Sequence, residues 1–193
     1  MGAIFQSLGR SVAAGVVLVI VLILAAGSGI HYDHAWGAFL MRWLHVISGV
    51  MWVGLLWYFN FVQTPSMPKI PDPEKPAVTK VIAPAALFWF RHAALWTVIT
   101  GLIVAWMNGY VVQALLLEKG VHTIGIGMWL ALIMAYNVWF IIWPNQKKAL
   151  GIVQVDADAK AKAARMAGMT SRFNTMLSIP MLYSMVAQQN GGL

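Results

Sequence analysis

The chain contains no cysteine and few charged residues. Only 10% of its 193 residues are Asp, Glu, Lys or Arg, whereas a soluble domain averages about 25%. The absence of cysteine excludes disulfides, thiolate metal sites and covalently attached c-type haem, which needs a C-x-x-C-H motif. The shortage of charge, together with 60% hydrophobic residues, indicates a membrane protein.

Acidic residues are scarce, and none of the six lies inside a long apolar segment. This argues against a proton pump that works through a buried carboxylate. The sequence also has no nucleophile–base pair and no phosphate-binding loop. The net charge is +7, but Lys and Arg lie mostly between the apolar segments, as membrane topology requires, so no nucleic-acid-binding face is indicated.

Five apolar segments are long enough to cross a bilayer. A helix needs roughly 20 residues to cross a hydrocarbon core of about 30 Å, and in lipid only a helix satisfies its own backbone. The sequence therefore predicts an all-α integral membrane bundle, a single domain over residues 1–193, with about five transmembrane helices. The expected spans are 11–30, 36–62, 81–107, 123–146 and 173–190.

The basic residues predict the orientation of these spans. With the N-terminus in the cytoplasm, ten basic residues lie inside and only Lys119 lies outside, and the C-terminus is then on the outer side. The proline-rich loop 63–80 is expected to be extended. Residues 153–168, with Asp–Lys pairs four residues apart among alanines, are expected to form a solvated helix that continues into the last span.

The second segment carries ionisable residues in a place where they are costly. At 100° per residue, one stripe of this helix holds Arg42, His45, Gly49, Trp52 and Asn60. An ionisable residue inside a membrane usually faces the bundle interior or a water-filled cavity. Because Gly49 lies one turn from His45, it leaves space beside the imidazole for a flat cofactor or a neighbouring helix.

The third segment repeats this pattern, with Trp96 on the face of His92 and Arg91 about 100° away. Neutral imidazole is a good axial ligand of haem iron, so His45 and His92 are candidate ligands of haem b, with Arg42 and Arg91 as partners of its propionates. The simpler explanation is that each His bonds across a helix interface. The two imidazoles differ in level by roughly 5 to 10 Å, so one haem shared by both is not favoured.

Other polar residues carry weaker signals. His31 and His34 belong to the segment HYDH, and two imidazoles with a carboxylate can hold copper or zinc. The alternative is a short polar turn. Inside the later segments, Asn137, Asn174 and Ser178 are expected to form hydrogen bonds between helices. The 12 methionines are scattered through apolar segments, and packing explains them better than copper binding.

Four stretches resemble, in this order, membrane segments of the bacterial cytochrome-c-linked urate hydroxylase family. They are RWLHVISGVMWVGLLWYFNFVQ (42–63), LFWFRHAALWTVITGL (87–102), YNVWFIIWPNQKKAL (136–150) and SRFNTMLSIPMLYSM (171–185). The chain resembles a short form that lacks the family's cytochrome c domain. Phe173 stands where the family usually has a His before the asparagine. The pattern L-H-x-x-x-G-x-x-W-x-G, Leu44 to Gly54, also resembles copper-resistance membrane proteins.

This resemblance implies a related membrane fold and a redox setting in a bacterial inner membrane, with the C-terminus periplasmic. Four functions stay open. The first is an electron-transfer protein that binds haem b and works with an external cytochrome c. The second is a non-catalytic accessory subunit of a respiratory-type complex. The third is an oxidase of urate or a similar planar anion, and the fourth is metal handling at the outer face. Lipid is a partner in every case, nucleic acid in none, and a homo-oligomer is compatible with the sequence.

Overall fold

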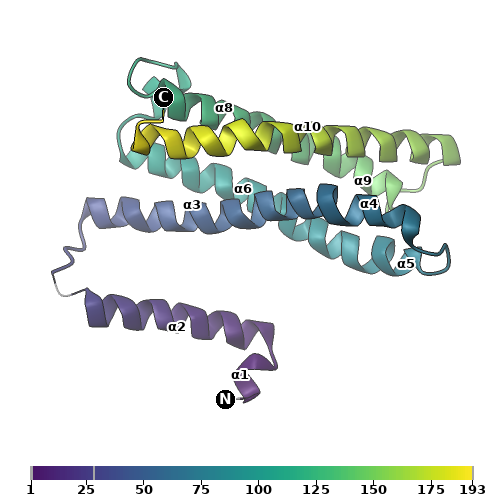
Figure 1. The fold of residues 1–193 in the computed structure, drawn as a ribbon, viewed down its shortest axis with the longest axis horizontal. Coiled ribbons are helices and arrows are strands. Elements are labelled where there is room, and N and C mark those ends of the chain that lie inside the picture. Colours follow the sequence, from purple (N-terminus) through teal and green to yellow (C-terminus); the bar gives the residue numbers. More distant parts are fainter. Residues whose placement is uncertain (1, 28, 193) are drawn as a thin grey trace. The chain divides into compact units, whose positions relative to one another are not determined.

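The computed structural model describes residues 2–27 and 29–192. Within these residues every element is a helix, which confirms the predicted all-α fold. The chain divides into two units, Met1–Gly37 and Ala38–Leu193. The first contains α1 (Gly2–Phe5) and α2 (Leu8–Ala26), and the second contains the helical bundle (Figure 1).

The bundle consists of long helices joined by short ones. In chain order its elements are α3 (His34–Trp57), η1 (Tyr58–Gln63), α4 (Thr64–Ser66), η2 (Met67–Lys69), α5 (Lys75–Ala77), η3 (Val78–Ile82), α6 (Ala83–Met107), α7 (Val111–Leu115), α8 (His122–Tyr136), η4 (Asn137–Ile142), α9 (Trp143–Ala149) and α10 (Ala157–Asn190). Three of these elements, η1, η3 and η4, are π-helical turns within longer helices, and η2 is a 3₁₀ turn.

Four helical stretches in the described part of the chain are long and apolar enough to cross a membrane. They are Leu8–Ala26, His34–Lys69, Lys75–Met107 and His122–Ala149. These correspond to the first four expected spans and indicate a multi-pass membrane protein. The expected fifth span forms the second half of α10, which is not among the four, so its crossing stays a prediction.

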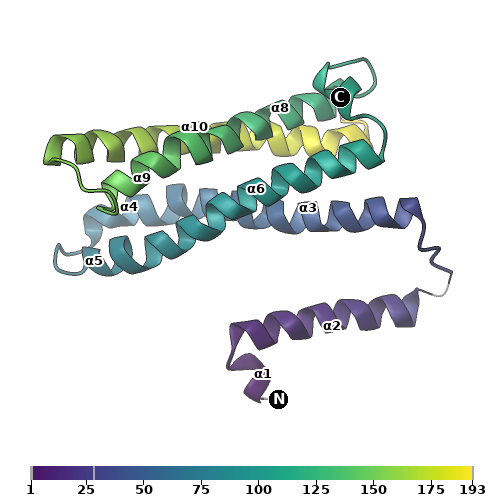
Figure 2. The same ribbon diagram turned by 180° about the vertical axis from the view of Figure 1, so that it is seen from behind.

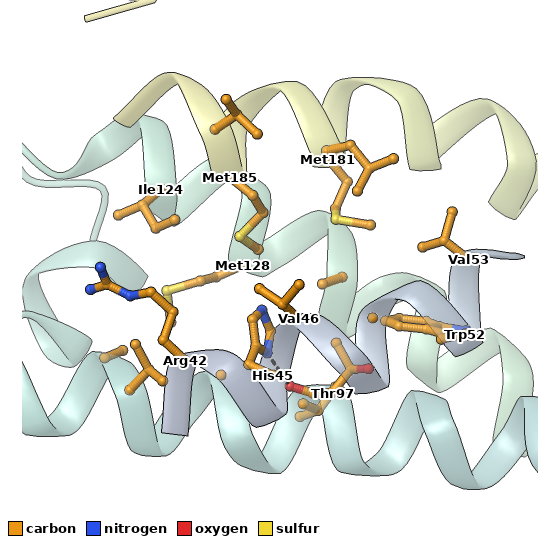
Figure 3. Close-up of a pocket in the computed structure, with 18 of the residues that line it drawn as sticks. Arg42, His45, Val46, Trp52, Val53, Thr97, Ile124, Met128, Met181 and Met185 are labelled. Carbon is orange, nitrogen blue, oxygen red and sulfur yellow. Dashed lines mark hydrogen bonds between the residues drawn. The ribbon is translucent and has the colours of Figure 1, made fainter. Parts of the chain in front are cut away.

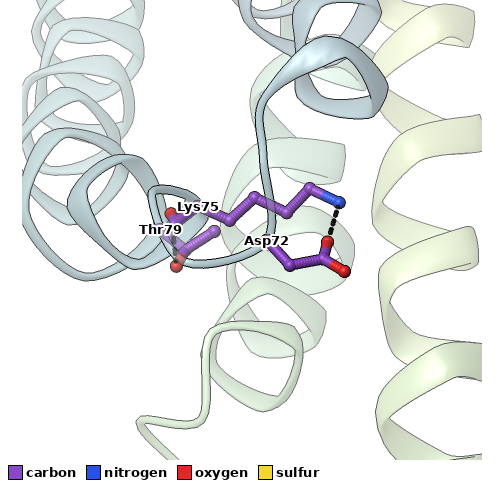
Figure 4. A network of polar contacts seen from close by, with 3 residues as sticks. All are labelled: Asp72, Lys75 and Thr79. Atoms are coloured by element: carbon purple, nitrogen blue, oxygen red, sulfur yellow. Dashed lines mark hydrogen bonds and ion pairs between the residues drawn. The ribbon is translucent and has the colours of Figure 1, made fainter.

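The proline-rich stretch 63–80 is not extended, as the sequence predicted, but mostly helical. Pro65, Pro68 and Pro76 each lie in the first turn of a short helix. At Pro76 the missing N–H has no helical partner to lose, and the fixed φ of proline suits a helix. Pro65 and Pro68 lie near the end of the continuous helical stretch His34–Lys69. The chain reverses between these helices, where Lys75 Nζ donates to Asp72 Oδ1 at 2.6 Å (Figure 4). This hydrogen bond, helped by the lysine charge, lowers the pKa of the Asp72 carboxyl.

The solvated helix predicted over 153–168 is present as the start of α10. It begins at Ala157, one residue after Asp156, whose Oδ1 accepts a hydrogen bond from Ala159 N at 2.7 Å and so caps the helix. The helix then continues through Pro180 to Asn190. In both views α8 and α10 lie side by side (Figure 1 and Figure 2).

The core of the bundle is formed by apolar side chains of α3, α6, α8, η4 and α10. Trp52 and Leu56 of α3 have no accessible surface, and Phe90 of α6 is 2% exposed. Interhelical hydrogen bonds accompany this packing. Asn137 Nδ2 donates to Asn174 Oδ1 at 2.8 Å.

Asn174 and Ser178 of α10 have no accessible surface and both bond to other helices. Asn174 Nδ2 donates to Met134 O at 2.9 Å. Ser178 Oγ accepts a hydrogen bond from Trp57 Nε1 at 2.9 Å. The interhelical bonding predicted for Asn137, Asn174 and Ser178 is therefore confirmed.

We predict that Asn174→Ala destabilises the bundle by about 1–3 kcal/mol, because it leaves the buried side-chain amide of Asn137 without its acceptor. Thermal unfolding of the detergent-solubilised protein measures the effect. Met176→Ala is the matched control, since this side chain lies two residues away on the same helix and is 58% exposed. Equal unfolding temperatures for the two variants would contradict this account.

Candidate functional site

A cavity of about 660 Å³ lies inside the bundle, lined by α3, α6, α8 and α10 (Figure 3). This volume falls within the range of small-molecule sites, roughly 300–1,000 Å³. Its walls are mostly aliphatic, with Met128, Met181 and Met185 among them. The few polar groups that line it therefore decide what it can bind.

His45 is held on one wall of the cavity by α6. Its Nδ1 lies 2.9 Å from Thr97 O, and because a carbonyl oxygen only accepts, Nδ1 carries the hydrogen and donates it. In the neutral ring Nε2 then keeps a free lone pair. Figure 3 shows the imidazole extending from α3 into the cavity. A histidine that binds a metal is usually oriented in this way, with its other nitrogen bonded to a carbonyl or carboxylate.

The imidazole fits against α6 because residue 101 is glycine. A Cβ on Gly101 would lie 2.8 Å from His45 Cε1 and 3.1 Å from its Nδ1. The first distance is shorter than a Cβ tolerates and the second is tighter than most such contacts, while the bond to Thr97 opposes movement of the ring. The sequence assigned the space beside the imidazole to Gly49, where a Cβ would meet only Thr97 Cγ2 at 3.9 Å. The close approach of α3 to α6 at His45 depends on Gly101 instead.

Arg42 lines the cavity beside His45, one turn earlier on α3. Among residues 2–27 and 29–192, no acidic side chain pairs with it, since the recorded ion pair is Lys75–Asp72. Tyr110, which follows α6, also lines the cavity. Burial raises the pKa of the Tyr110 phenol, although the charge of Arg42 opposes this. The phenol therefore stays protonated and can donate a hydrogen bond beside the guanidinium.

Trp52 contributes a buried donor. The side chain has no accessible surface, and its Nε1 has no hydrogen-bond acceptor in the structure. A buried polar group left without a partner costs about 1–3 kcal/mol. Because Trp52 lines the cavity, an acceptor on a bound ligand could partner this N–H.

The candidate residues of α6 do not line this cavity. The Nδ1 of His92 donates to a carbonyl of its own helix at 2.7 Å, and its ring meets Trp139 edge-on at 5.7 Å. The guanidinium carbon of Arg91 lies 4.0 Å from the ring centroid of Trp143. Trp96 is 55% exposed. The structure thus brings Arg42, His45, Gly49 and Trp52 together and leaves Arg91, His92 and Trp96 apart, while their roles in binding stay predictions.

The HYDH segment forms the turn before α3 and the first residue of that helix. Asp33 Oδ1 accepts a hydrogen bond from Trp36 N at 3.1 Å, as a helix cap does. His31 and His34 are exposed. In the part of the chain that the structure describes, no three His, Cys, Asp or Glu side chains gather as a metal site requires.

Sequence reasoning missed the residues that the other helices bring to the cavity. Thr97 and Gly101 are small residues four apart, a spacing typical of helices that approach closely in membranes, and this signal could have found them. The three methionines gave no such signal, because they lie on α8 and α10 and meet only through the tertiary fold.

We predict that Gly101→Ala destabilises the protein by about 1–3 kcal/mol, because the new methyl group overpacks against the imidazole of His45. Gly54→Ala is the matched control. A Cβ on Gly54 meets nothing within 4 Å, so this variant gains about 0.5–1 kcal/mol of helix stability without a clash. Thermal unfolding in detergent compares the two. If Gly101→Ala proves as stable as Gly54→Ala, the contact between residue 101 and the His45 imidazole does not limit the packing of α3 against α6.

Comparison with known proteins supports the resemblance inferred from the sequence. Residues 102–191 match the family model described as urate oxidase N-terminal. This range covers a little under half of the chain and includes the stretches 136–150 and 171–185, together with α8 and α10 of the cavity wall. No curated protein and no solved structure matches the chain. Residues 102–191 are therefore similar to the urate oxidase N-terminal family.

Proposed function

We propose that this protein is a membrane electron-transfer protein whose cavity binds haem b. The observation that carries the proposal is the placement of His45, whose Nδ1 bonds to Thr97 O at 2.9 Å while the ring extends into an apolar cavity of about 660 Å³. Neutral imidazole ligates haem iron. A hydrogen bond to the other ring nitrogen fixes the tautomer and raises the basicity of the ligand.

The other polar groups of the cavity suit the same ligand. Arg42 has no acidic partner among the described residues, and a guanidinium pairs well with a carboxylate such as a haem propionate. The aliphatic walls suit a flat apolar ring. When bound, the haem would supply one-electron chemistry. The residues of this chain hold it, orient it and set its electrostatic surroundings.

We predict that the purified protein binds added haemin and that His45→Ala weakens this binding at least about tenfold, which corresponds to a loss of about 1.4 kcal/mol. His92→Ala is the matched control and should bind like the wild type, because His92 does not line the cavity. An absorbance titration in detergent measures all three proteins. The proposal fails if the wild type binds no haemin or if His45→Ala binds it equally well.

A second candidate function, oxidation of urate, is favoured by the family match over residues 102–191. Urate is a planar anion, and Arg42 could bind it in the same cavity. Each urate would give up two electrons, which would reduce two molecules of an external oxidised cytochrome c. To test this function, urate and oxidised cytochrome c are added to the purified protein used in the haemin titration, and reduction of cytochrome c is measured. Reduction of cytochrome c that depends on urate and is lost in Arg42→Gln would support it, and its absence would contradict it.

We also infer that the protein lies in a bacterial inner membrane with its N-terminus in the cytoplasm and its C-terminus in the periplasm. The excess of Lys and Arg in the loops on one side supports this orientation. Because the chain has no cysteine, single cysteines can report it. Lys119→Cys should react with a membrane-impermeant maleimide added to intact spheroplasts, and Lys148→Cys only after permeabilisation. The reverse pattern would refute the orientation.

A further inference from the structure

Three methionines line the cavity that holds His45. Met128 comes from α8, and Met181 and Met185 come from α10. Figure 3 shows Met181 and Met185 extending from α10 on the far side of the cavity from the α3 backbone, with Met128 drawn near Arg42. Scattered in the sequence, these residues suggest only packing. In the fold the three methionines line the same cavity as the imidazole of His45, whose Nε2 is free. Their thioether sulfurs are soft ligands for a metal.

The direction of the helices decides which methionine faces His45. α3 and α10 run in opposite directions along the bundle (Figure 1 and Figure 2). Arg42 therefore lies toward the end of α10, and Trp52 lies at the level of Met181, with which it shares a core cluster. Met185 is one turn further along α10 than Met181. In Figure 3 it lies across the cavity from His45.

The burial of the three side chains points to the same residue. Met128 is 9% exposed and Met181 is 5% exposed, and each belongs to a packed core cluster. Met185 is only half-buried and packs at the edge of both clusters. Its terminal methyl lies 3.3 Å from the position that a Cβ on Gly127 would take, so the glycine of α8 leaves room for the thioether.

We propose that Met185 would hold the haem together with His45, with its thioether sulfur as the second protein ligand of the iron. This inference rests on the proposed function. A thioether is uncharged, and no Asp or Glu is among the described residues that line the cavity. His/Met ligation raises the reduction potential of a haem. Six-coordinate iron has no free position for a substrate, so this ligand pair makes the site an electron carrier.

The test compares haem-loaded wild type with Met185→Leu, which keeps the size of the side chain and removes the sulfur. Met128→Leu and Met181→Leu are matched controls, because each removes a thioether from the same cavity. Absorption and electron paramagnetic resonance spectra report the spin state. We expect a low-spin wild type, loss of the low-spin signal in Met185→Leu with haem still bound, and an unchanged signal in both controls.

Met185→His adds a second measurement, the reduction potential of the haem. A purely structural role of Met185 would leave this potential unchanged. The variant should keep the low-spin state but lower the reduction potential, because imidazole replaces the thioether. An unchanged spin state in Met185→Leu, or its loss in Met128→Leu instead, would overturn the assignment. If Met185→Leu does not fold, an unchanged potential in Met185→His overturns it. A high-spin wild type refutes this inference alone, whereas a wild type that binds no haem refutes the proposed function as well.

Discussion

Hydrogen bonds between helices hold α3 against the rest of the bundle. In lipid, apolar side chains gain little by leaving hydrocarbon for another helix, so polar contacts and close packing must supply much of the attachment. Such bonds from the helical stretch His34–Lys69 include His45–Thr97 and Trp57–Ser178 from α3, and Asn60–Ser171 from η1. His45 and Trp57, which make the first two of these bonds, both line the cavity. The bonds that attach α3 therefore also position residues of the site.

The cavity combines features that are costly unless a ligand is bound. Arg42 has no acidic partner among the described residues, and the Nε1 of Trp52 has no acceptor. Both lie beside aliphatic walls, where an unpaired charge or donor is unfavourable. A flat ligand with carboxylates at one edge would pair the guanidinium, and its apolar ring would fill the space between α3 and α10. The imidazole of His45, held by its hydrogen bond to Thr97 O, extends into this space.

Helical periodicity predicted the α3 side of the site and little of the rest. Arg42, His45, Gly49 and Trp52 share a stripe that a 3.6-residue period identifies, and all four line the cavity. Asn60 was expected on the same stripe, but the π-helical turn η1 shifts the period, and Asn60 lines a smaller cavity of about 110 Å³. The sequence pairs His92 with His45 because each has an Arg nearby and a Trp on its face, although the face of α6 that meets α3 is set by Thr97 and Gly101. Met185 could not be assigned, because its role depends on how α10 lies against α3.

The decisive measurement is a reduced-minus-oxidised absorption spectrum of the protein purified from its native membrane, compared with that of His45→Ala prepared in the same way. We predict the bands of a b-type haem in the wild type and their loss in the variant, at equal protein recovery and with the helical content preserved. A correctly folded wild type without haem bands would contradict the account, and so would a variant that retains the bands unchanged.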